Sequence, residues 1–174
     1  MKADIGTIEW RRLRQVLNDF ADYVIRVSRE NLGANGSYAS GLLGDSLEKI
    51  VEIGDNRFSV SIVLQDYWEY VENGRKPGKF PPPNRIREWI LVKPIKPKAG
   101  KDGRLPTVNQ LAYLIGRKIS LEGIPKRPFF RPAVEEAKAY YDEAINMAID
   151  EDVAEWVNEK VLQRGLYEEL MRYL

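Results

Sequence analysis

The spacing of apolar residues at the carboxyl end most constrains what this chain can fold into. From Val134 to Val161, apolar side chains recur every three or four residues. That spacing predicts a long amphipathic helix with one face packed against other elements. Pro132 suits its first turn, where a proline sacrifices no intrahelical hydrogen bond. We expect Gly165 to end the helix, with residues 166–174 as a short terminal turn or helix.

A second amphipathic pattern occupies the amino-terminal end. Apolar residues recur with helical spacing from Ile8 to about Asn31, and charged residues fill the opposite face. Thr7 is a residue type that caps helix starts, and Gly33 tolerates the backbone conformation found just past helix ends. The pattern predicts a long helix between these two residues.

Between the two helical patterns the sequence favours strands. Ser37–Asp45 is predicted to be a loop, Leu47–Ile53 a first strand and Gly54–Asn56 a turn. Phe58–Leu64 then alternates apolar and polar residues, as in a strand with one buried face. The predicted fold is therefore α+β, with a small antiparallel sheet packed against a long N-terminal helix and a long C-terminal helix.

The sequence predicts one domain, residues 1–174, with a core formed by 8–75 and 125–165. Residues 76–124 are predicted to be a basic helical insertion on this core. We expect helices at Asn84–Val92 and Thr107–Ser120, joined by a linker rich in lysine, proline and glycine.

Charge is strongly segregated along the chain although the net charge is only +1. Residues 1–74 carry 8 Lys/Arg and 12 Asp/Glu, and residues 132–174 carry 4 and 11. Residues 75–131 carry 15 Lys/Arg and only 3 Asp/Glu, a net charge of +12. Such asymmetry points to charged partners, either nucleic acid or a complementary surface on another copy.

The amino-acid composition limits which catalytic groups and metal ligands the chain can supply. Cysteine and histidine are both absent, which excludes thiolate nucleophiles, disulfides, Cys/His zinc sites and histidine bases. We therefore expect no enzyme, no cofactor and no metal. No apolar run approaches the roughly 20 residues that span a bilayer, and the first residues lack the pattern of a signal peptide. We expect no membrane association.

Two further sequence elements carry a family resemblance. Residues 67–75 read YWEYVENGR, and residues 125–133 read PKRPFFRPA. They resemble the neck and tail-completion family of tailed phages, described as head–tail joining or minor tail proteins. In that family a Y-x-x-Y-V-E-x-G element precedes an R-P-F-x-R-P-A element that opens the last helix. Residues 37–47 also resemble the family's T-G-x-L-x-x-S-I stretch. The segment 76–124 is similar to longer members and absent from short ones.

The resemblance implies a structural virion protein at the head–tail junction, assembled in the host cytoplasm. Its subunits would form a homo-oligomeric ring through which DNA passes, with portal, adaptor or tail proteins as neighbours. No catalytic residues are implied.

We expect the interface with a subunit or partner to include Tyr67, Trp68, Tyr70, Arg75, Arg127, Phe129, Phe130 and Arg131. If Tyr67, Trp68 and Tyr70 are extended, they alternate between core and surface. Phe129 and Phe130 fit either the core or an interface. In an assembled ring, the basic insertion could meet the acidic C-terminal region of an adjacent copy.

Two alternatives follow from the residues alone. The basic segment 75–131 could bind nucleic acid, with Arg75, Lys76, Lys79, Arg85 and Arg87 on phosphates and Phe80 or Trp89 stacked on bases. The other is a carboxylate-metal enzyme, which would use Asp142, Glu143, Asp150, Glu151 and Asp152. On an exposed helix face, such acidic residues more often serve as solvated charge.

Overall fold

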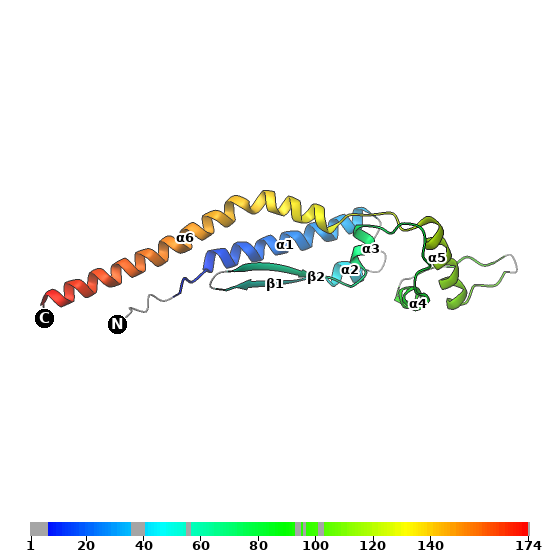
Figure 1. Cartoon of the computed structure of the whole chain (residues 1–174), viewed down its shortest axis with the longest axis horizontal. Helices are drawn as coiled ribbons and strands as arrows, with labels where there is room; N and C mark the ends of the chain where they lie inside the picture. The colour runs from blue at the N-terminus through cyan, green and yellow to red at the C-terminus, as the bar shows by residue number, and fades with distance from the viewer. Residues whose placement is uncertain are drawn as a thin grey trace. The chain divides into compact units, whose positions relative to one another are not determined.

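The structure is a computed structural model that describes residues 7–35, 41–54, 57–92, 95, 97–100 and 103–173. Its elements along the chain are α1 (Arg11–Ala34), α2 (Leu42–Asp45), β1 (Glu48–Ile53), β2 (Phe58–Val63), α3 (Trp68–Glu72), α4 (Pro83–Val92), α5 (Val108–Glu122) and α6 (Phe130–Tyr173) (Figure 1). The chain forms two compact units. Unit 1 contains 1–24, 49–62 and 134–174, and unit 2 contains 25–48 and 63–133.

In unit 1 the β1–β2 hairpin lies along one side of α1, and α6 lies along the other side (Figure 1). Leu13 and Leu17 of α1 and Ala148 of α6 form the buried centre. Partly buried residues from both strands pack on this centre, among them Val51 and Val60. The predicted α+β fold, with a small antiparallel sheet and long N- and C-terminal helices, is confirmed. The alternating pattern of β2 fits this fold, because Val60 on one strand face packs against the apolar cluster that α1 and α6 share.

Aromatic rings join α1 to α6 in the same unit. Tyr23 stacks on Tyr140 with ring centroids 5.5 Å apart, and it meets Tyr141 edge-on at 5.7 Å. Phe20 also meets Tyr141 edge-on at 6.0 Å. Tyr23 donates its hydroxyl hydrogen to the Glu136 carboxylate at 2.6 Å. Aromatic pairs of this geometry add to the burial of apolar surface, so they hold the two helices in register.

Unit 2 has a core around Phe129, which is fully buried. Leu32 at the end of α1 and Leu43 in α2 pack against it, together with Trp68 and Val71 of α3. A second small core joins α4 to α5 through Ile86, Ile90 and Ala112. Unit 2 is therefore two helical clusters connected by the chain before and after α4 and α5.

A buried glycine and a helix cap shape the α4–α5 cluster. Gly116 is buried in α5, and a Cβ placed there would lie 2.5 Å from Cζ of Phe80. Phe80 stacks on Tyr113 of the same helix at 5.9 Å. Thr107 and Gln110 form a reciprocal capping box at the start of α5. The predicted Thr107–Ser120 helix is confirmed, and the glycine inside it makes room for an aromatic ring.

Several sequence predictions need correction. α1 begins at Arg11 and not at Ile8, so Thr7 does not cap it. The aromatic run is the helix α3 and not an extended segment, so its side chains do not alternate. α6 continues through Gly165 to Tyr173. The predicted loop 37–45 ends in the short helix α2.

Other predicted features agree or lie outside the described residues. The two strands match the predicted ranges to within one residue, and α4 matches to within one. Residues 37–40, 55–56, 93–94, 96 and 101–102 belong to the predicted loop, turn and linker and lie outside the described residues. No helix in the described ranges is both long and apolar enough to cross a bilayer.

A pair of glycine substitutions tests the backbone of unit 2. Gly74 has a φ of +69°, and an added Cβ would lie 2.5 Å from the Ile124 carbonyl oxygen. We expect Gly74→Ala to lower the free energy of unfolding by about 2 kcal/mol or more. Denaturant titration followed by circular dichroism measures this.

Gly33→Ala is the matched control for that change. Gly33 lies in α1, and a Cβ there would have nothing within 4 Å. Because alanine favours helix, this variant should gain about 0.5–1 kcal/mol. Equal effects from the two substitutions would contradict the assigned strain at Gly74.

Candidate functional site

The two sequence elements of the family resemblance meet in unit 2 at the side chain of Glu72. This residue ends α3, a five-residue helix whose last turn is closed by the Asn73 N–H donating to the Glu69 carbonyl oxygen. Gly74 then turns the chain with positive φ, and Arg75 pairs with Ile124 as an isolated antiparallel bridge. The backbone N–H of Arg127 donates to the Val71 carbonyl oxygen at 2.8 Å. These contacts bring residues 124–131 alongside α3.

Glu72 caps the start of α6. Its carboxylate accepts backbone hydrogen bonds from Phe129 at 2.7 Å, Phe130 at 2.9 Å and Arg131 at 3.1 Å. Glu72 is only 3% exposed. The N–H groups at a helix start have no partner inside the helix, and the helix dipole favours negative charge there. A buried carboxylate and a buried helix terminus therefore satisfy each other.

Asn31 of α1 and Asn35, the residue just after α1, hold the same segment from its carbonyl side. Asn31 donates its side-chain N–H to the Phe129 carbonyl oxygen at 3.0 Å, and Asn35 donates to that of Pro128 at 3.0 Å. The peptide groups that precede α6 thus have partners for both donors and acceptors. This satisfies the requirement that buried backbone groups be hydrogen-bonded.

Four residues of the predicted interface are packing residues of this site. Phe129 is fully buried, and Tyr67, Trp68 and Phe130 are partly buried against the same core. Trp68 meets Phe130 edge-on, with ring centroids 5.8 Å apart. Burial raises the pKa of the Tyr67 phenol. Of the two interpretations of the phenylalanines, the structure gives Phe129 the core role.

The other four predicted interface residues lie nearer the surface. Tyr70 is 54% exposed, and Arg127 and Arg131 are exposed. Arg131 donates to the Asn73 side-chain oxygen at 3.5 Å. Arg75 is half-buried and donates to the Lys79 carbonyl oxygen. The site therefore presents Tyr70 and two arginines beside a rigid, capped helix start, and contact of any of these with a partner stays a prediction.

The predicted phosphate contacts do not form one cluster of available cations. Lys76 and Lys79 are exposed. Arg85 is exposed but pairs with Glu88 at 3.6 Å. Arg87 is half-buried, and its guanidinium donates to the side-chain oxygens of Asn84 and Asn109. The arginines in this set thus already have partners within unit 2.

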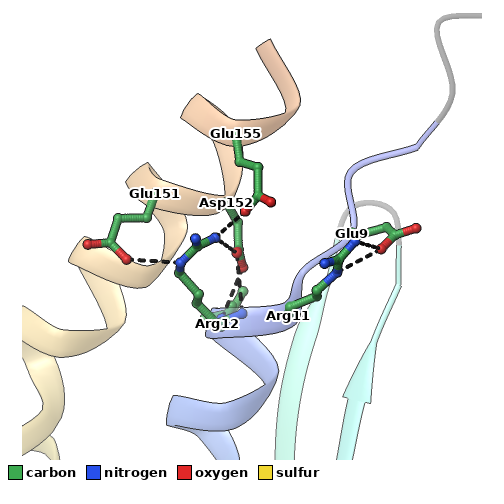
Figure 2. A network of polar contacts seen from close by, with 7 residues as sticks. Glu9, Arg11, Arg12, Glu151, Asp152 and Glu155 are labelled. Atoms are coloured by element: carbon green, nitrogen blue, oxygen red, sulfur yellow. Dashed lines mark hydrogen bonds and ion pairs between the residues drawn. The ribbon is translucent and has the colours of Figure 1, made fainter. Parts of the chain in front are cut away.

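Unit 1 contains a second carboxylate that caps a helix from another element. Asp152 of α6 is 2% exposed, and it accepts the backbone N–H of Leu13 at 3.0 Å and that of Arg12 at 3.2 Å (Figure 2). It replaces the cap that the sequence predicted at Thr7. The sequence spacing places Asp152 on the same helix face as Ile145 and Ala148. That apolar face is the one expected to pack against other elements.

Arg12 gathers the acidic residues of α6 around this cap. Its guanidinium contacts Glu151 at 3.2 Å, Asp152 at 3.2 Å and Glu155 (Figure 2). The hydrogen bond from Arg12 is the main reason that the pKa of Glu155 lies below its ordinary value. Two of the carboxylates assigned to a metal enzyme, Glu151 and Asp152, are thus engaged by an arginine and a helix start. Within the described ranges, no group of acidic residues could hold a metal ion.

No model of a known protein family matches this chain, and neither a curated protein nor a solved structure shows significant similarity to it.

Removing the charge of Glu72 tests the cap at α6. Glu72→Gln keeps the shape of the side chain but leaves an amide facing three N–H donors. We expect the free energy of unfolding to fall by about 2 kcal/mol or more. Glu69→Gln is the matched control, because Glu69 is exposed on the same short helix. A loss equal to that of the control would contradict the capping role.

Glu155 gives a prediction about pH. Because its folded pKa is lowered from 4.5, its contribution to stability is present above pH 4.5 and is lost as the pH falls through the folded pKa. The difference in unfolding free energy between the wild-type protein and Glu155→Gln should be constant above pH 4.5 and shrink below it. Urea titrations across this range measure it.

The cause of that pH effect can be tested separately. Arg12 contributes most to the shift, so Glu155→Gln made in an Arg12→Gln background should lose most of its pH dependence. A difference that stays constant through the acid range, or a dependence that survives without Arg12, would contradict the assignment.

Proposed function

We propose that this chain is a structural subunit of a tailed-phage neck, a head–tail joining or tail-completion protein that assembles into a ring. The single observation that carries the proposal is the hydrogen bonding at Glu72. The glutamate of the Y-x-x-Y-V-E-x-G element accepts the backbone N–H groups of the R-P-F-x-R-P-A element. Two motifs that are distant in sequence therefore form one structural module. The resemblance is supported by contacts between the two motifs and not by their sequences alone.

The roles of the motif residues fit a family that carries no catalytic residues. Glu72 caps a helix, Gly74 turns the chain, and Phe129 fills the core. Each does a structural task, and the exposed residues of the two motifs include Tyr70, Arg127 and Arg131. Aromatic and arginine side chains are enriched at protein interfaces. The surface beside the module is thus suited to a protein partner.

Exposed apolar side chains support assembly as the activity. In unit 2, Trp89, Leu91, Leu114 and Leu121 are between 40% and 74% exposed. In unit 1, Tyr140 and Met147 are 70% and 54% exposed. Single exposed apolar residues are normal, but several together on one helix mark surfaces that are covered in an assembly. In a ring, each subunit presents two different faces to its neighbours.

DNA has a secondary place in this proposal. A ring at the head–tail junction encloses the DNA that passes through it, and exposed lysines such as Lys76 and Lys79 could face the duplex transiently. Arg85 and Arg87 of the same segment contact other residues of unit 2. The basic segment is therefore assigned first to protein contacts.

The masses of assembled species test the neck assignment. The 20.1 kDa chain should appear in native mass spectrometry as a closed oligomer, or form one when mixed with the portal or tail-tube protein of the same phage. Negative-stain images should show rings. Portal protein from an unrelated phage is the control. A persistent monomer that binds neither cognate protein would contradict the proposal.

A further inference from the structure

Helix α5 of unit 2 carries apolar side chains on two opposite faces. One face carries Ala112 and Gly116, which are buried against α4 and Phe80. The opposite face carries exposed side chains at helical spacing: Tyr113, Leu114, Arg117, Lys118 and Leu121. Leu114 and Leu121 are 53% and 63% exposed. A surface helix usually places polar residues opposite its core face, so this basic, leucine-bearing face has the composition of a contact surface.

Helix α6 in unit 1 carries a matching stripe of opposite charge. Its exposed residues include a series with alternating steps of three and four: Tyr140, Glu143, Met147, Asp150, Ala154 and Val157. Steps of three and four place these residues along one face of the helix. Leu114, Arg117 or Lys118, and Leu121 repeat the same spacing on α5. From Tyr140 to Asp150 the α6 stripe alternates apolar and acidic residues, and the α5 face alternates apolar and basic residues.

We infer that the exposed face of α5 in one copy packs along the α6 stripe of a second copy, with Arg117 and Lys118 lying between Glu143 and Asp150 and reaching one carboxylate each. The inference deepens the proposed function and rests on its ring assembly. The lengths agree, because the nine residues from Tyr113 to Leu121 span about 14 Å and the eight residues from Glu143 to Asp150 span about 12 Å.

Charge selects this pairing over the symmetric ones. Two α6 stripes placed together would oppose Glu143 and Asp150 with their own copies, and two α5 faces would do the same with Arg117 and Lys118. Like charges in facing positions are unfavourable, whereas the mixed pairing joins opposite charges around an apolar seam. The mixed contact is heterologous, because each copy uses one face toward each neighbour, and such contacts generate rings when the rotation closes.

Two charge-reversal variants of the full chain test this contact. The first is Arg117→Glu with Lys118→Glu, and the second is Glu143→Lys with Asp150→Lys. Each should weaken self-association by about tenfold or more at low ionic strength, because like charges then meet across the seam. Light scattering coupled to size-exclusion chromatography measures the mass, and circular dichroism verifies that each variant is folded.

Combining the two sets of charge reversals distinguishes a specific contact between α5 and α6 from a general effect of altered net charge on assembly. A mixture of the two variants should assemble, because each reversed face then meets a reversed face of the other variant. The chain with all four substitutions should assemble by itself for the same reason. The controls carry equal charge changes at exposed positions outside the two stripes: Glu135→Lys with Asp142→Lys, and Lys76→Glu with Lys79→Glu.

The remaining outcomes overturn either the inference or the proposed function, and they distinguish the two. A wild-type chain that stays monomeric at low salt, or an oligomer that tolerates either reversal, rules out this contact while the neck assignment survives through binding to portal or tail protein. If Arg117→Glu with Lys118→Glu abolishes duplex DNA binding and leaves self-association intact, the α5 face is a nucleic-acid site. If the swap restores oligomers that bind no neck protein, the contact is real and the proposed function fails.

Discussion

The fold of unit 2 depends on one buried carboxylate. Glu72 lies in a core of aromatic and aliphatic side chains, where an unpaired charge would be strongly unfavourable. The three N–H groups at residues 129–131 lie in the same region and would be equally unfavourable without a partner. Neither group could be buried alone. Their mutual hydrogen bonds determine where α6 begins, and they join segments 57 residues apart in the sequence.

Unit 1 uses the same physical solution. Asp152 is buried on the apolar face of α6, and it accepts the first free N–H groups of α1 from a position 139 residues away. Arg12 pairs with the acidic residues that surround it, so the negative charge of this part of α6 is partly balanced (Figure 2). In both units a carboxylate from one helix caps another. This arrangement specifies which helix ends must meet, because an apolar replacement would leave the N–H groups unsatisfied.

The two caps also influence which side chains of the chain stay exposed to possible partners. Glu72, Phe129 and Trp68 serve capping and packing, and the exposed residues near the module include Tyr70, Arg127 and Arg131. The segregated charge has a similar consequence. Arg117 and Lys118 lie on the exposed face of α5, and Glu143 and Asp150 lie on the α6 stripe. In the proposed neck subunit, these exposed surfaces would be the ones that contact other molecules.

The sequence by itself determined the elements with strong periodicity. The long terminal helices, the hairpin and the helices of the basic segment follow from local spacing of apolar residues, and apart from the end of α6 their predicted ranges are close to those observed. The tertiary structure determined the features that depend on residues distant in sequence. Trp68–Glu72 is a helix because α3 packs Trp68 and Val71 against the same core, and α1 starts at Arg11 because Asp152 caps it there. Among the site residues, the aromatic side chains were found from the sequence, whereas Glu72 and Asp152 were missed as caps. Local patterns cannot reveal a hydrogen bond whose acceptor is supplied from another element of the fold.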